Sequence, residues 1–243
     1  MTLRSVVAAV LLCWLLVVSR AVAAQTFGYL GTGGPAFWGG LSPEWSVCGS
    51  GHRQSPVDFS RGYPSEQSRL AIDYGPTTGE VFNNGHTIEV ETEGHDTLTL
   101  DGVAYNLVQF HFHSGSEHRV AGVGFDMELH LVHANAAGQN AVVAVLLNRG
   151  TGSGPLLPIF SHLPTDVNVK HELDAPFNPK TFLPRSMAHF RYAGSLTTPP
   201  CTEGVHWIVM REPMTVSSED MAQFNERIHF NARPVQRTLG APH

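Results

Sequence analysis

Three histidines with strand-like spacing are the residues of this sequence best suited to chemistry. His111 and His113 stand in Q-F-H-F-H, and His130 stands in E-L-H-L-V-H. Side chains alternate between the two faces of a β-strand, so residues two positions apart share a face. The two phenylalanines therefore point into a core, and both neighbouring histidines point the other way. Glycines between the two segments predict a turn, and antiparallel pairing would then bring all three imidazoles to one point.

Three neutral imidazoles with a fourth position left open are the ligand set of a catalytic zinc. Gln109 and Glu128 each precede a histidine by two residues on the same face. A side-chain oxygen there can accept the spare N–H of the ligand and fix its tautomer. An isolated His-X-His pair is more often hydrogen-bonded than metal-bound. The third histidine and the two acceptors favour the metal.

The segments around these histidines resemble the α-class carbonic anhydrases. The resemblance rests on F-H-F-H, S-E-H and E-L-H-L-V-H, and on F-G-Y, G-P-A-F-W-G, R-Q-S-P-V-D, N-N-G-H, Y-A-G-S-L-T-T-P-P-C and N-A-R-P-V-Q. These segments follow the family's order from Phe27 to about Gln236. The resemblance implies a zinc enzyme that reversibly hydrates CO2 to bicarbonate and a proton. The zinc ligands that it implies are His111, His113 and His130.

The resemblance also implies three catalytic side chains. Thr197 matches the threonine that accepts the hydrogen of zinc-bound hydroxide and donates its own hydrogen to Glu117, whose carboxylate can only accept. His86 matches the proton shuttle, because an imidazole with an ordinary pKa near 6.5 takes and releases protons near neutrality. Without the resemblance, His86 would be one loop histidine among 14.

The remaining matched positions surround the metal. Asn231 joins Gln109 and Glu128 as a residue that supports the ligands. The other matches form a substrate pocket and a polar water path: Val132, Val142, Leu196, Thr197, Thr198 and Trp207 for the pocket, and Tyr29, Asn84 and Glu89 for the path. Without the resemblance, the apolar members would be ordinary core residues. Glu89 stands where the family often has an amide, so its effect on the water path is left open.

The first 24 residues read as a secretory signal peptide. Met1–Arg4 carries a positive charge, Val6–Val18 is apolar, and Ala21–Ala24 offers small residues for cleavage. An uncleaved membrane anchor is the alternative, but the apolar run is short for a membrane span. The interpretation predicts a single domain at 25–243, periplasmic or secreted, with no stable membrane anchor.

Removal of the signal peptide would leave two of the three cysteines, Cys48 and Cys201. An even pair in an exported protein predicts a disulfide, and the resemblance independently pairs these positions. Two free buried thiols are the alternative. The short segments after Ser114 and at Ala134–Ala141 are similar to the bacterial branch and predict an open cavity mouth.

Short alternating segments with few helices predict a mainly β fold with one large, mostly antiparallel sheet. The resemblance implies about ten strands, with zinc on the central ones. The arm from Phe27 to Pro56 should rest on the body through Phe37 and Trp38. Other expected elements are strands within 70–74, 81–91 and 97–102, buried strands at Asn140–Asn148 and His206–Met210, and short helices near Ile159–Leu163 and Ser217–Phe224.

Composition and motifs limit the alternatives. A net charge of −6 gives no reason to expect a nucleic-acid partner, whereas the resemblance implies a small-molecule substrate and a possible homodimer. A cupin would use His111, His113 and Glu117, but Tyr105 replaces the first glycine of its motif and no second motif follows. A non-catalytic binding module on the anhydrase fold typically lacks one or more zinc histidines. This chain keeps all three.

Overall fold

The computed structural model describes residues 26–60 and 69–237, so the predicted signal peptide lies outside the described residues. The strands of these ranges are β1 (Asp58–Phe59), β2 (Leu70–Asp73), β3 (Gly79–Asn83), β4 (Ile88–Thr92), β5 (Thr97–Leu100), β6 (Val103–Ser114), β7 (Arg119–Val120), β8 (Met127–Ala134), β9 (Asn140–Gly150), β10 (Lys170–Glu172), β11 (His189–Ser195), β12 (Glu203–Met210) and β13 (Met214–Ser217). The helices are α1 (Trp38–Leu41), α2 (Val47–Ser50), α3 (Leu157–Phe160) and α4 (Ser218–Ile228), with 3-10 turns at Gly31–Gly33, Pro43–Trp45, Gly154–Leu156 and Pro179–Phe182.

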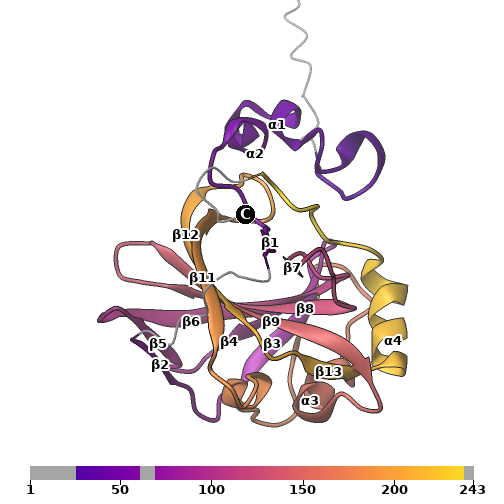
Figure 1. Cartoon of the computed structure of the whole chain (residues 1–243). Helices are drawn as coiled ribbons and strands as arrows, with labels where there is room; N and C mark the ends of the chain where they lie inside the picture. The colour runs from indigo at the N-terminus through magenta and orange to yellow at the C-terminus, as the bar shows by residue number, and fades with distance from the viewer. Residues whose placement is uncertain (1–25, 61–68, 238–243) are drawn as a thin grey trace, which may run out of the picture.

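One large sheet dominates the described part of the chain (Figure 1). It has 11 strands, with the order β10-β3-β4-β6-β8-β9-β12-β11 and with β5, β2 and β13 attached beside this path. The central strands β6, β8 and β9 pair antiparallel, while β9 pairs parallel with β12 and β13. A second, two-stranded sheet joins β1 and β7. The prediction of a mainly β fold with a large, mostly antiparallel sheet is confirmed.

The sheet separates two hydrophobic clusters. The larger cluster contains Phe110 and Phe112 of β6, both fully buried, as the alternation predicts. The smaller cluster contains Trp207 of β12. Strand β9 supplies both, because alternate side chains enter opposite faces: Val143, Val145 and Leu147 enter the larger cluster, and Val142, Ala144 and Leu146 enter the smaller one. The prediction that this strand is buried on both faces is confirmed.

The N-terminal arm with α1 and α2 lies at one end of the molecule, away from α3 and α4 (Figure 1). Trp38 anchors it: the ring is fully buried, and Nε1 donates to Gly28 O and Gly33 O at 2.9 Å each. The expectation that Phe37 also packs on the body is wrong, since this side chain is 53% exposed. Phe37 precedes α1 and Trp38 opens it, and successive residues of a helical turn project in different directions.

A disulfide joins Cys48 of α2 to Cys201 in the loop after β11. This bridge is the one predicted from the two cysteines that remain after removal of the signal peptide. The buried Arg233 guanidinium reinforces this junction, because its Nη2 donates to Cys48 O at 2.9 Å and its Nη1 donates to Ser55 O at 2.8 Å. The arm is therefore tied to the loop that carries Thr197, even though the two segments are far apart in the sequence.

Candidate metal centre

Strands β6 and β8 bring the three predicted ligands together. In the register of this pair, His111 lies opposite His130, and His113 lies opposite Glu128. One ring nitrogen from each of His111, His113 and His130 lies within 4.8 Å of the others. Alternation along two paired strands therefore produces the cluster without help from any loop.

Each of these histidines uses its other ring nitrogen to donate a hydrogen bond outward. The acceptors and distances are Gln109 Oε1 for His111 Nδ1 at 2.8 Å, Asn231 O for His113 Nδ1 at 2.9 Å, and Glu128 Oε1 for His130 Nε2 at 2.8 Å. The structure thus brings together the ligands and all three residues expected to support them. Such partners fix ring orientation and tautomer.

The inner nitrogens test whether a metal fits. A backbone carbonyl and an ionised carboxylate can only accept, so both His113 and His130 must donate outward. Their inner atoms, His113 Nε2 and His130 Nδ1, then carry lone pairs, and they lie 3.1 Å apart. Two lone pairs at this distance repel unless a cation lies against both. Two tetrahedral zinc ligands with Zn–N bonds near 2.1 Å would stand roughly 3.4 Å apart, close to the distance between these atoms, so the site fits zinc.

His118 is a fourth histidine of this region, and sequence reasoning assigned it no role. It is buried, its Nδ1 donates to Glu128 Oε1 at 2.6 Å, and its Nε2 is hydrogen-bonded to the Tyr192 hydroxyl at 2.7 Å. The backbone N–H groups of Glu117 and His118 donate to Glu128 Oε2. Burial alone would raise the pKa of Glu128, but His118 and the hydrogen bonds from His118 and His130 hold it well below its usual range. The only sequence signal that pointed to His118 was its place in the S-E-H segment.

Burial also favours the neutral form of two of the ligand rings, His111 and His130. Burial lowers the pKa of His111 well below its ordinary value, with further lowering from His113 and His130. Burial and His113 likewise lower the pKa of His130, against the opposite effect of Glu128. Neutral imidazole is the form that ligates a metal.

Glu117 is fully buried close to the ligands. Its Oε1 accepts from the backbone N–H of Arg233 at 2.8 Å, whereas its Oε2 has no hydrogen-bond partner among the described residues. Thr197 is also buried, but the hydrogen bonds within the described ranges include none between these two side chains. The expected Thr197–Glu117 relay therefore stays a prediction, with Oε2 still able to accept.

A cavity of about 250 Å³ opens beside the histidines. Its described lining is Phe27, Tyr29, Asn84, His86, Thr87, Glu89, Gln109, His111, His113 and Thr198. The residues expected along the polar water path are all included. His86 is half-buried at this wall, and its ring stacks on Phe27 with centroids 4.0 Å apart and planes 11° from parallel. Burial lowers the pKa of His86.

The turn that carries His86 is held on both sides. Asn84 Oδ1 accepts the backbone N–H groups of His86 at 2.9 Å and Thr87 at 2.8 Å. Asn231 Nδ2 donates to His86 O at 3.0 Å. Gly85, between Asn84 and His86, has a φ of 83°, which favours glycine. The position of the His86 backbone is therefore set by side chains of the site itself.

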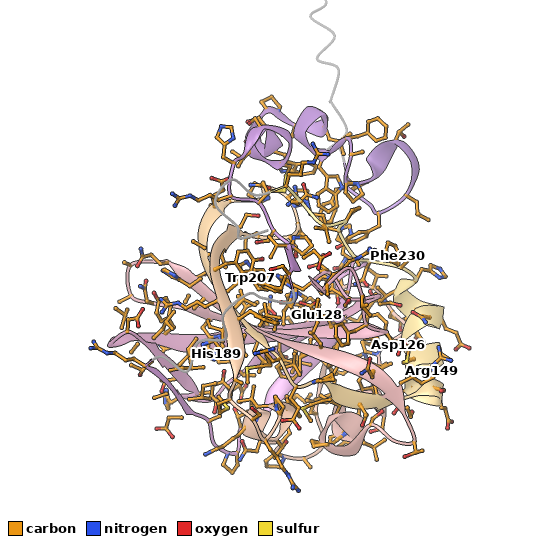
Figure 2. The ribbon with its side chains drawn as sticks, viewed as in Figure 1. Asp126, Glu128, Arg149, His189, Trp207 and Phe230 are labelled. Carbon is orange, nitrogen blue, oxygen red and sulfur yellow. A yellow bond between two sulfur atoms is a disulfide. The ribbon has the colours of Figure 1, made fainter. Side chains whose placement is uncertain are left out.

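The four apolar residues expected to face the substrate lie together in the smaller hydrophobic cluster. Val142 and Trp207 are buried, and Val132 and Leu196 pack against them. Val132 pairs with Val142, and Val142 pairs with Trp207, so three neighbouring strands place these side chains side by side. The Trp207 ring lies 4.9 Å from that of His130, and Figure 2 shows it near the middle of the molecule with Glu128. An apolar surface thus lies beside His130, one of the predicted ligands.

Comparison with known proteins agrees with this fold and site. A family model described as eukaryotic-type carbonic anhydrase matches residues 33–239. The carbonic anhydrase of Pectobacterium carotovorum is 37% identical over 223 residues, which cover 91% of each chain. That of Neisseria gonorrhoeae is 41% identical over 212 residues, covering 86% of this chain and 84% of the relative.

Solved structures agree as well. The α-carbonic anhydrase of Thermovibrio ammonificans, solved in complex with sulfanilamide, superposes with a TM-score of 0.83 at 39% identity, covering 86% of this chain and 94% of that one. The sheet, the histidine cluster and these matches together show that the chain belongs to the α-carbonic anhydrase family, the enzymes of CO2 hydration.

Proposed function

We propose that this carbonic anhydrase uses a Zn2+ ion as its cofactor and that His111, His113 and His130 hold this ion. The observation that carries the proposal is the 3.1 Å approach of two unprotonated ring nitrogens, which a cation relieves. When bound, zinc lowers the pKa of a water ligand and so supplies hydroxide near neutral pH. The cupin alternative is set aside, because the fold and the family model are those of a carbonic anhydrase.

The protein's own residues orient the site. Gln109, Asn231 and Glu128 accept the outer ring N–H groups, which leaves the inner ring nitrogens available to hold a metal. Thr197 is proposed to donate its hydrogen to Glu117 Oε2, the buried oxygen with no described partner. With its hydrogen committed, the threonine oxygen can only accept, and it therefore orients the attacking oxygen.

The apolar surface binds the substrate. CO2 carries no net charge, so Val132, Val142, Leu196 and Trp207 can hold it by contact while excluding water. Thr198, which lines the cavity beside the histidines, would supply a polar contact. Exclusion of bulk water also strengthens the electrostatic interactions inside the site. These assignments are supported by the cluster that the four apolar side chains form and by the contact of the Trp207 ring with that of His130.

The polar wall carries the proton away. Tyr29, Asn84, Glu89 and His86 line one cavity with His111, so a short chain of waters could connect them. His86 is the proposed shuttle, because its neutral ring can accept a proton at the cavity wall and release it to buffer. Its lowered pKa favours release over retention.

We also propose that the protein is exported, to the periplasm or the external medium. The signal-peptide pattern and the Cys48–Cys201 disulfide support this proposal. Within the described ranges, no helix is long and apolar enough to cross a membrane.

Metal analysis combined with a CO2 hydration assay tests the proposed function. We expect one zinc per chain, loss of hydration after removal of zinc by a chelator, and recovery when zinc is added back. Hydration that persists at full rate in protein shown to be free of metal would contradict the proposal.

A further inference from the structure

Glu89 gives the metal cavity an unusual charge. It lies on β4 directly opposite His111 of β6, and its half-buried side chain lines the cavity. The described lining includes no other acidic residue and no lysine or arginine. Burial lowers the pKa of His86, which keeps that ring neutral, and the other two lining histidines, His111 and His113, are proposed metal ligands. Glu89 is therefore the one lining group expected to carry a formal charge.

The charge of Glu89 is not neutralised by a partner. Asn84 Nδ2 donates to Glu89 Oε2 at 3.2 Å, a neutral hydrogen bond that leaves the carboxylate charge in place. Among the described residues Glu89 forms no ion pair. Burial and Glu91 raise the pKa of Glu89, whereas the Asn84 hydrogen bond and Lys170 lower it. Lys170 is itself paired with Glu80 at 3.3 Å and with Glu91. Glu91 adds a further negative charge on the same face of β4.

The consequences differ for charged and uncharged ligands. A half-buried carboxylate is screened less than an exposed one, and its field acts over about 8 Å at physiological ionic strength. An anion in the cavity is therefore repelled, whereas CO2 is unaffected. We propose that Glu89 is a specificity-determining residue, which weakens the binding of monovalent anions at the metal site while leaving the uncharged substrate untouched. This inference rests on the proposed function, and the product bicarbonate is one such anion.

Binding of thiocyanate tests this proposal without relying on turnover. The protein is loaded with cobalt(II), and the visible spectrum of the metal is followed as thiocyanate is added at pH 8.5. The principal variant is Glu89→Gln, which keeps the shape of the side chain and an acceptor for Asn84. Glu80→Gln is the matched control, because it removes the same charge from the neighbouring strand β3 outside the cavity. Glu89→Asp keeps the charge and serves if the glutamine variant folds poorly.

We expect the Kd of thiocyanate to fall on the order of fivefold in Glu89→Gln and to stay unchanged in Glu80→Gln and Glu89→Asp. The Kd of neutral 1,2,4-triazole should be the same in all four proteins. An unchanged thiocyanate Kd in Glu89→Gln overturns the proposal. Equal tightening of triazole also overturns it, because the effect would then be steric.

The experiment distinguishes failure of the proposed metal site from failure of the proposed role of Glu89. If the wild-type protein takes up no cobalt or zinc, the proposed function fails and the role of Glu89 fails with it. If metal is bound and the anion affinities are equal, the role of Glu89 alone is wrong.

Discussion

His113 and His130 face each other through ring nitrogens 3.1 Å apart, and the hydrogen-bond partners of both rings require that neither of these nitrogens carries a proton. The backbone of Asn231 and the carboxylate of Glu128 each accept from the outer nitrogen of one ring. A protein that assembles this pair in a buried position creates a repulsion that only a cation or a proton removes. The arrangement is therefore suited to metal, and its dependence on metal can be measured.

Replacement of one ligand should eliminate the site. In His113→Ala we expect loss of stoichiometric zinc and a fall in CO2 hydration of at least about 100-fold, because two ligands do not hold a tetrahedral centre. Metal analysis and stopped-flow hydration measure both effects. His162→Ala, which removes a histidine outside the cavity, should retain both zinc and activity. Full zinc content in His113→Ala would show that the ligand assignment is wrong.

Replacement of the shuttle should separate two rates. His86→Ala should slow steady-state hydration about tenfold or more in weakly basic buffer, yet leave CO2–bicarbonate exchange at chemical equilibrium nearly intact. Exchange does not require the proton to reach solvent, whereas turnover does. Concentrated imidazole should restore much of the lost turnover. His95→Ala is the control, since His95 is exposed and does not line the cavity.

Two results would withdraw the shuttle role of His86. A parallel fall of hydration and exchange would mean that His86 shapes the metal site instead. No change in either rate would mean that buffer reaches the site directly through an open mouth.

Loss of the disulfide should affect stability more than catalysis. The bridge spans a sequence separation of 153 residues, so its removal in a Cys48→Ser, Cys201→Ser double variant should lower the free energy of unfolding by about 2–5 kcal/mol. Hydration at moderate temperature should fall less, because neither cysteine lines the cavity. Chemical denaturation and a hydration assay on the same samples compare the two effects. Recovery of both cysteines as free thiols from oxidatively folded protein would remove the bridge itself.

A buried histidine away from the metal should make the fold sensitive to acid. His133 is fully buried, its Nδ1 donates to Ala141 O at 3.2 Å, and its Nε2 lies 2.5 Å from the Tyr74 hydroxyl. Burial lowers the pKa of His133 to about 4. The pKa of this histidine in the unfolded chain has its ordinary value of 6.5. Between pH 6.5 and pH 4, the unfolded chain therefore binds a proton that the folded protein does not.

Stability should therefore fall as the pH drops through this window, by up to about 3 kcal/mol from this group, with no further loss from it at lower pH. Guanidinium denaturation between pH 7 and pH 4 measures the slope. In His133→Gln, which keeps a donor and an acceptor but does not titrate, the slope should be smaller. An identical slope in the two proteins would assign the acid sensitivity to other groups.

Several features followed from local sequence pattern. The alternation of phenylalanine and histidine at 109–113 placed Phe110 and Phe112 in the core and the histidines on the opposite face, because a strand has a period of two. The same period predicted that His130 would share this face once its strand paired antiparallel, and the structure places it opposite His111. The continuous apolar run from Ala141 to Leu147 indicated a strand that is buried on both faces. Such patterns persist because they depend only on neighbours along the chain.

The sequence by itself thus determined the β-strands, the face that carries the three histidines, and the two cysteines able to pair. Only the tertiary structure decided that Asn231, 118 residues from His113, accepts that ligand's N–H, that His118 and His130 share Glu128, and that Trp38 is buried while Phe37 is exposed. The periodicity of a sequence does not specify how the chain runs between distant segments. Contacts over such separations form only when distant segments pack against the sheet, and so they are properties of the folded chain alone.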